Sequence, residues 1–433
     1  MELHRRNHHA AADPSRSILS APAEDEVEYP EGGIAAWLVV LGAWCALFAS
    51  MGLLNTFGVL QAWVAQHQLS DYPESTVGWI FSIHGFIVYF GGLQVVKTSL
   101  GSLFDTYGVK PLVISGTIGI TATIMFFSVS SSYYQFLLSF GVLGGLSSSL
   151  LFTPSVSAIG HWFCRRGALA TGVAFTAGST GGIIFPLIVL HLTPKIGFPW
   201  AIRVIGFLTC GFCIASCFLL RTRLPLNKHA GASIDLVALK DAKYGMTTLA
   251  IFFIESAIFI SSTYITSYAI NVGIDPLHAY RLVAFINAAS IPGRALPGYF
   301  ADRYGRFNVM AATSSICSLF IFTVWLLCGN NEAAITAFAV LFGFWSGTAV
   351  GLAPVCIAQV CKIEDYGKRS GTAFAMSSFG ALVGIPAAGA ILNRPGTSFP
   401  GLISFVGSLY VAGSIAFLVV RGIGGGWGLR VIF

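Results

Sequence analysis

The chain has 433 residues, of which 55% are hydrophobic and only 10% are charged. A typical soluble domain carries about 25% charged residues, so a water-soluble fold of this composition could not cover its own surface. The formal net charge of +6 is spread over short connecting segments, which argues against a nucleic-acid-binding protein. From residue 34 onward, apolar stretches long enough to cross a hydrocarbon core of about 30 Å recur with few interruptions. The composition therefore indicates an integral membrane protein.

The first 33 residues differ from the rest because they are polar, with basic and acidic clusters and no long apolar run. This composition predicts a disordered cytosolic tail over residues 1–33. A secretory signal would need a short apolar core near the start and a small-residue cleavage site, and neither precedes the first long apolar run. The first apolar run is therefore expected to remain as a permanent helix.

Dividing the apolar stretches at proline, glycine and charge clusters predicts twelve membrane-spanning helices. Their expected ranges are 34–63, 77–99, 111–130, 134–160, 167–190, 199–220, 246–271, 278–300, 308–328, 333–360, 370–392 and 401–421. An even number of spans places both termini on one side. With the tail inside, the inner loops hold fourteen basic residues, whereas the outer connectors hold only three, Lys195, Arg281 and Arg394. This asymmetry predicts cytoplasmic termini.

A polar loop over residues 221–245 separates span six from span seven and divides the chain into two halves. We expect an N-terminal six-helix bundle over residues 34–220, a C-terminal six-helix bundle over 246–421, and a short cytosolic tail over 422–433. The halves repeat one another: a Gly, Asp, Tyr, Gly pattern after span two recurs after span eight at an offset of 197 residues. The prolines at 154 and 186 recur at 354 and 386. Landmarks at nearly one offset predict duplication of a six-helix unit, and hence an all-α membrane fold of two pseudo-symmetric bundles.

The repeated loops resemble the G-x-L-x-D-x-x-G-x-[KR] signature of the major facilitator superfamily. The sequence Pro-Glu-Gly-Gly-Ile-Ala-Ala-Trp over residues 30–37 is similar to the start of span one in the monocarboxylate porter family, especially its fungal branch. The resemblance extends over residues 29–433. It implies a secondary transporter in which these loops act as gating latches between two rocking halves. The residues of these loops to which the resemblance assigns a gating role are Gly101, Asp105, Gly108 and Lys110 in the first loop, and Gly298, Asp302, Arg303, Gly305 and Arg306 in the second.

The physical sense of this signature is readable from the residue types alone. The first glycine of each loop permits close helix approach, the aspartate can pair with arginine or cap a helix start, and the last glycine suits a tight turn. For each loop alone, a capped turn without any gating role is an equally good interpretation.

Glu255 in span seven, Arg294 in span eight and His84 in span two are ionisable side chains well inside predicted spans, whereas Arg203 lies near the outer start of span six, where its side chain can reach the membrane surface. Because an unpaired charge in the membrane costs at least about 2.5–3.5 kcal/mol, each of the first three is a candidate for the transport pathway. Glu255 and Arg294 are expected at similar depths, so neighbouring helices could bring them together. A fixed structural ion pair is the alternative interpretation for these two, and a neutral, hydrogen-bonded imidazole is the alternative for His84.

Asn55 in span one, with Asn287 and Ser290 in span eight, offers hydrogen-bonding groups at the depth of a central cavity, although such residues also hold helices together. In monocarboxylate porters, a basic residue in span one and an Asp-x-x-x-Arg pair in span eight are tied to substrate and proton binding. Arg294 matches that arginine, whereas Asn55 and Ser290 stand where the family has charged partners. This departure favours a larger or less acidic metabolite than lactate or pyruvate.

No phosphate-binding loop or catalytic motif occurs in the sequence, so neither an ATP-driven pump nor an enzyme is expected. Cys210 and Cys213 form a CxxC inside an apolar span, where packing is the more ordinary role than metal or redox chemistry, and no cofactor or metal is expected. The expected partners are a small-molecule substrate, protons and the lipid bilayer, and the expected location is the plasma membrane. Efflux of a secondary metabolite and a transporter-like nutrient sensor remain alternatives to uptake of a monocarboxylate-like nutrient.

Overall fold

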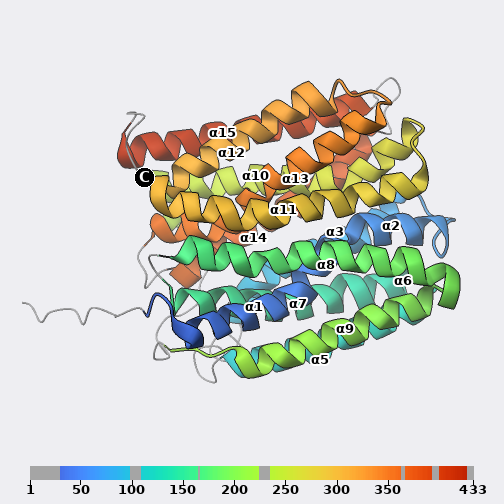
Figure 1. The fold of residues 1–433 in the computed structure, drawn as a ribbon, viewed down its shortest axis with the longest axis horizontal. Coiled ribbons are helices and arrows are strands. Elements are labelled where there is room, and N and C mark those ends of the chain that lie inside the picture. The colour runs from blue at the N-terminus through green and yellow to red at the C-terminus, as the bar shows by residue number, and fades with distance from the viewer. Residues whose placement is uncertain are drawn as a thin grey trace, which may run out of the picture.

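A computed structural model of the chain describes residues 30–97, 109–163, 166–223, 235–361, 366–392 and 399–426. Every regular element in these ranges is helical. Ten helices, of 20 to 30 residues, are long and apolar enough to cross a membrane. The long helices run side by side, and the described chain enters the first helix and leaves the last at the same end of the bundle (Figure 1). The prediction of an all-α membrane fold is confirmed.

The described residues of the first half form six long rods, four of which are single helices without a break. The elements are α1 (Gly33–Leu54), α2 (Phe57–Gln66), α3 (Glu74–Lys97), α5 (Val109–Val129), α6 (Tyr133–Phe136), the π-helical η1 (Leu137–Gly144), α7 (Gly145–Gly160), α8 (Gly167–Ile196) and α9 (Phe198–Leu219). Elements α6, η1 and α7 form one continuous rod of 28 residues. Prolines at 154, 186 and 194 lie inside α7 and α8.

The second half repeats this arrangement after a short 3-10 turn. Its elements are η2 (Ala238–Lys240), α10 (Ala242–Asn271), α11 (Pro276–Tyr304), α12 (Arg306–Phe320), the π-helical η3 (Ile321–Trp325), α13 (Glu332–Gln359), α14 (Tyr366–Leu392) and α15 (Phe399–Gly425). Helices α3 and α11 are not among the ten apolar spans: the apolar stretch of α3, Thr76–Gly91, is shorter, and α11 carries several charges. With these two rods, the described helices follow the twelve predicted spans in order.

Two details differ from the predicted ranges. Span one is broken after Leu54, and the hydroxyl of Thr56 donates a hydrogen bond to the carbonyl of Gly52 at the break. Helix α11 continues to Tyr304, so Asp302 and Arg303 lie in its last turn and not in a loop. Gly305, with φ of 98°, ends the helix because glycine adopts this left-handed backbone without steric cost.

The two halves meet mainly through two pairs of helices. Helix α11 packs against α8, and α14 packs against α3, so each half contributes one helix to each pair (Figure 1). Helix α8 starts, and α11 finishes, at the end of the bundle where Glu31 precedes α1. We name this end the Glu31 end, and the opposite end, where α2 finishes, the Gln66 end.

Candidate functional site

A buried arginine and a buried glutamate lie near the middle of the contact between the halves. Arg294 in α11 is 5% exposed and Glu255 in α10 is 4% exposed. Both positions fall well inside long helices of the bundle, where ionisable groups are costly and are retained for function or pairing. The sequence predicts that neighbouring helices could bring these two residues together.

The guanidinium of Arg294 crosses to the other half of the molecule. Its Nη1 donates a hydrogen bond of 2.6 Å to the carbonyl of Phe175 in α8. Its Nε has no hydrogen-bond partner among the described residues. Gly178 gives the group room: a Cβ at this position would lie 3.1 Å from Arg294 Nη1 and 3.1 Å from Asn55 Nδ2. The Asn55 amide, at the break in span one, and the Arg294 guanidinium therefore both lie against Gly178.

Glu255 does not form a direct ion pair with Arg294 in the described structure. The two groups nevertheless interact electrostatically, and both interact with Tyr89 of α3. Tyr89 is 7% exposed, and its ring stacks on Phe374 of α14 with centroids 5.7 Å apart. Because Glu255 and Arg294 are not in contact, neither charge has the other as a direct ion-pair partner. A ligand group or a proton can supply the missing partner.

Sequence reasoning misses Tyr89. Aromatic residues are frequent in membrane helices, and the spacing in span two does not distinguish this tyrosine from its neighbours. Only the tertiary structure, in which its ring stacks on Phe374 of α14, brings its phenol within electrostatic range of the buried charges.

Asn287 and Ser290 face α8 and use their polar groups in the contact between the halves. The Asn287 amide donates to the carbonyls of Val283 at 2.9 Å and Gly182 at 3.4 Å. The hydroxyl of Ser290 hydrogen-bonds with that of Ser179 in α8. These contacts place both residues in the α8–α11 contact on the same helix as Arg294.

His84 lies away from this centre, inside the first half. Its side chain is 0% exposed, and its Nδ1 lies 2.8 Å from the carbonyl oxygen of Phe140. The ring also packs edge-on against Phe57 with centroids 5.1 Å apart. The structure therefore does not bring His84 together with Arg294 and Glu255.

The second signature segment, at the end of α11, joins the halves at the Glu31 end. The carboxylate of Asp302 accepts a hydrogen bond of 3.2 Å from the backbone N–H of Leu169, in the first turn of α8, and lies 3.6 Å from Arg306 Nη2. A Cβ at Gly298 would lie 2.9 Å from the carbonyl oxygen of Ala168, so the glycine permits this approach. Arg303 and Lys110 are exposed. Gly101, Asp105 and Gly108 lie outside the described residues.

Glu31 reaches the same helix start from the other side. Its carboxylate accepts a hydrogen bond of 3.0 Å from the backbone N–H of Arg166, the residue before α8. The sequence predicts a disordered tail over 1–33; residues 1–29 lie outside the described ranges, and Glu31 has a defined position. Two carboxylates thus face the N-terminus of α8, where unpaired N–H groups and the helix dipole favour negative charge.

The sequence matches the family described as Major Facilitator Superfamily over residues 34–330. The chain belongs to this superfamily. This transporter is 38% identical to an MFS-type transporter of Gibberella moniliformis, over 91% of this chain and 92% of the relative. It is 34% identical to the aspyridones efflux protein apdF of Emericella nidulans, over 93% and 81% of the two chains. The crystal structure of the human organic anion transporter MFSD10 has the same fold, with a TM-score of 0.64, 15% identity, and coverage of 88% of this chain and 98% of that one.

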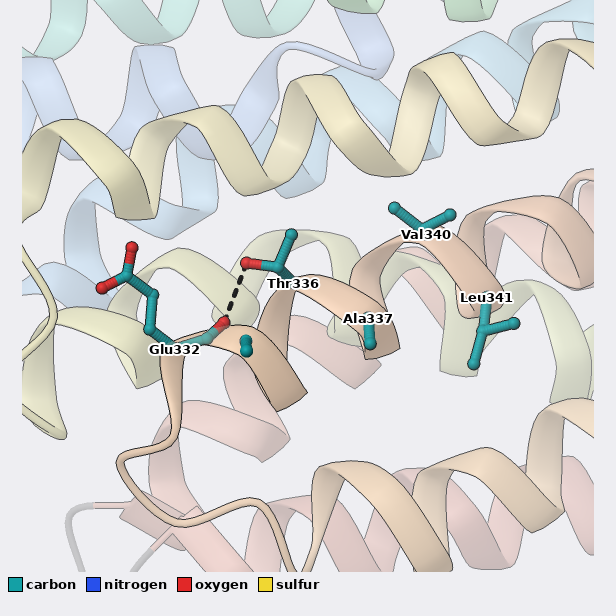
Figure 2. Close-up of a pocket in the computed structure, with 6 residues that line it drawn as sticks. Glu332, Thr336, Ala337, Val340 and Leu341 are labelled. Carbon is teal, nitrogen blue, oxygen red and sulfur yellow. Dashed lines mark hydrogen bonds between the residues drawn. The ribbon is translucent and has the colours of Figure 1, made fainter.

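Two hollows of this major facilitator transporter lie apart from Arg294 and Glu255. One, of about 780 Å³, follows a single face of α13 and is lined by Glu332, Ala333, Thr336, Ala337, Val340 and Leu341 (Figure 2). It is mostly apolar, and the hydroxyl of Thr336 is bonded to the carbonyl of Glu332. The other, of about 280 Å³, lies between α2 and α10, one helix from each half, toward the Gln66 end.

Proposed function

We propose that this chain is a secondary active transporter that moves a small organic solute with a carboxylate-like group by alternating access. The observation that carries the proposal is the Arg294 guanidinium, which is buried between the halves, bonded to one backbone carbonyl, and not ion-paired with Glu255. A guanidinium in such a place binds a carboxylate through two parallel hydrogen bonds. The matching arginine of monocarboxylate porters supports the same role.

In this proposal Glu255 takes the part of the acid that is missing at Ser290. When Glu255 binds a proton, its charge no longer competes for Arg294, and the guanidinium is available to the solute carboxylate. Asn55 supplies an uncharged hydrogen-bonding group where the porters have a base, and Tyr89, which also belongs to the first half, supplies a phenol. This arrangement couples solute binding to proton binding through a shared electrostatic interaction.

Alternating access would proceed by rocking the two halves about this centre. The α8–α11 contact and Asp302 close the Glu31 end, which we place in the cytoplasm on the basis of the basic inner loops. The plasma membrane is the proposed location.

Efflux of a secondary metabolite is the second candidate, and the similarity to the aspyridones efflux protein favours it. A carrier of this kind moves its solute along whichever combined gradient exists, so the same site serves both directions. Flux in reconstituted vesicles separates either form of transport from a nutrient sensor, since a sensor binds solute without moving it.

The test is pH-dependent flux of a radiolabelled organic-acid panel in proteoliposomes, with Arg294→Lys, Glu255→Gln and the double variant at equal reconstituted amounts. Arg294→Lys keeps the charge but loses the planar fork, so the apparent affinity for the acid should fall at least tenfold. Glu255→Gln should remove the pH dependence. Normal affinity in Arg294→Lys contradicts carboxylate binding, and wild-type pH dependence in Glu255→Gln contradicts proton coupling.

A further inference from the structure

The hollow between α2 and α10 has an unusual wall for a membrane protein. Three carboxamides and three hydroxyls contribute to it: Gln61, Gln66, Asn271, Thr263, Thr266 and Ser267. We name this hollow the amide cleft. None of the described residues that line it carries a formal charge. Its chemistry therefore differs from that of the Arg294 centre.

Two polar atoms of the amide cleft have no hydrogen-bond partner among the described residues, Gln61 Oε1 and Thr266 Oγ1. Thr266 is 2% exposed, so bulk water does not readily replace a partner there. A buried polar atom without a partner costs about 1–3 kcal/mol. Both atoms are covered in this conformation, so a ligand in the cleft bonds to them, and removes this cost, once the side chains around them turn.

One face of α10 runs from the charged centre to the cleft. Glu255, Phe259, Thr263, Thr266 and Ile270 follow one another at intervals of three or four residues, so they share one face of α10. Thr263 lies eight residues beyond Glu255, which corresponds to about 12 Å along the helix. Phe259 stands between them, and its ring lies 6.0 Å from the ring of Tyr89.

The inner limit of the cleft is a close approach of the two halves. A Cβ at Gly58 of α2 would lie 3.2 Å from the carbonyl oxygen of Ser262 in α10. Toward the Gln66 end, the hydroxyl of Tyr280 in α11 donates a hydrogen bond of 3.3 Å to Gln66 Oε1. Residues of both halves therefore surround the cleft, and a solute in it would contact both.

We propose that the amide cleft is a binding subsite for an uncharged polar group, such as an amide or a hydroxyl-bearing ring, separate from the Arg294 centre. Carboxamides and hydroxyls donate and accept hydrogen bonds but offer no counter-charge, so they recognise neutral groups over carboxylates. The volume of about 280 Å³ admits a small ring compound. Only the position of this subsite on a transport path rests on the proposed function.

The test compares nicotinamide with nicotinate, which have the same ring and differ in an amide against a carboxylate. Binding is titrated by calorimetry on the purified full-length chain in lipid nanodiscs, with uracil as a second uncharged probe. Gln61→Leu and Thr266→Val each remove hydrogen-bonding atoms with little change of shape. Each should weaken nicotinamide binding about 3- to 10-fold, the effect of one hydrogen bond.

The matched control is Thr323→Val, because the Thr323 hydroxyl is exposed and donates to the carbonyl of Leu319 in its own rod. It should leave nicotinamide binding within 2-fold of wild type. Nicotinate binding should be insensitive to Gln61→Leu and Thr266→Val. If Thr266→Val does not fold, Gln61→Leu alone decides the matter.

The proposal is overturned if neither nicotinamide nor uracil binds the wild-type chain, or if the variant that folds binds nicotinamide as tightly as wild type. Equal weakening of nicotinate by the same variants also overturns it, since the cleft would then not select uncharged groups. These outcomes are independent of flux: a chain that binds nicotinamide but moves no organic acid contradicts the proposed transport function and leaves the subsite in place.

Discussion

The two ends of the contact between the halves are built differently. Toward the Glu31 end, α8 meets α11 through glycines and backbone atoms: a methyl group at Gly172 would overlap the carbonyl oxygen of Arg294, and one at Gly298 would lie 2.9 Å from the carbonyl oxygen of Ala168. At the Gln66 end, α2 meets α10 and α11 through amide and hydroxyl side chains around the amide cleft. One contact is close-packed, and the other is polar and hollow.

This difference bears on how the halves can separate. Close-packed backbone contacts have little freedom to relax, so they form fully or break, which suits a two-state element. Side-chain hydrogen bonds between amides and hydroxyls exchange readily with water and solute, because the net free energy of each is only about 0.5–1.5 kcal/mol. We therefore expect substitutions at the Glu31 end to affect transport more strongly than substitutions at the Gln66 end.

The largest effect is expected from Gly172→Ala. The new methyl must displace the Arg294 carbonyl and push α8 from α11, at a cost of about 1–3 kcal/mol. Flux in proteoliposomes should fall at least 10-fold at equal protein amount. Gly211→Ala is the control, because a Cβ at Gly211 meets nothing within 4 Å in the middle of α9. Equal flux in the two variants would contradict the close-packed contact at Gly172.

Asp302→Asn should have the next largest effect. The amide can still accept the hydrogen bond from Leu169 but loses the charge that favours the start of α8 and pairs with Arg306. Flux should fall about 3- to 10-fold while protein abundance is unchanged. Asp241→Asn is the control, since Asp241 caps α10 within one half by accepting from the Lys243 N–H at 3.0 Å. If flux and protein abundance fall together in Asp302→Asn, the role of Asp302 is in folding and not in transport.

A smaller effect is expected from Tyr280→Phe, which removes the hydrogen bond to Gln66 between the halves. The amide cleft should open more often, and a Ser267→Cys side chain should react about twice as fast with a charged thiol reagent. Tyr268→Phe is the control, because the Tyr268 hydroxyl donates to the carbonyl of Gly329 within the second half. An unchanged rate in Tyr280→Phe, or an equal increase in the control, would remove Tyr280 from the closure of this end.

The smallest effect concerns Asp235, which fixes the start of the second half onto α14. Its carboxylate lies 3.2 Å from Lys368 Nζ, and its backbone N–H donates to the Thr372 hydroxyl at 3.0 Å. Desolvation raises the pKa of this carboxyl, but hydrogen bonds from the Ala238 N–H and Lys368, with the Lys368 charge, outweigh it, and the pKa lies below its usual value.

Because this pKa is lowered in the folded state, the associated stability is present above the unfolded pKa and is lost as pH falls through the folded one. Asp235→Asn should therefore lower the free energy of unfolding by about 0.2–1 kcal/mol. The difference from wild type should stay constant from pH 8 to pH 5 and shrink only below about pH 4. Thermal unfolding across this range checks it, with the exposed Asp71→Asn as control. A difference that disappears between pH 7 and pH 5 would assign the effect to another group.

Part of the candidate site is visible in the sequence because intramembrane charge is rare. Arg294 and Glu255 stand out in apolar spans, and the structure buries both near the contact between the halves. The direct pairing of the two is not seen: Arg294 is bonded to the Phe175 carbonyl, a backbone group that no side-chain pattern announces. His84 is also an ionisable residue inside a predicted span, yet it is buried within the first half, against Phe140. The rarity of an ionisable residue does not indicate which helices its side chain contacts.

The sequence by itself determined the all-helical membrane fold, the order of the spans and the membership of the superfamily. These follow from composition, from the length of apolar runs and from a repeated motif, all of which are local properties of the chain. Only the tertiary structure decided that Tyr89 lies within electrostatic range of Arg294, that Asp302 contacts α8 of the other half, and that Gln61 and Thr266 share one cleft. These relations join helices far apart in sequence, and apolar periodicity does not specify which helices meet, because every face of a membrane helix is apolar to a similar degree.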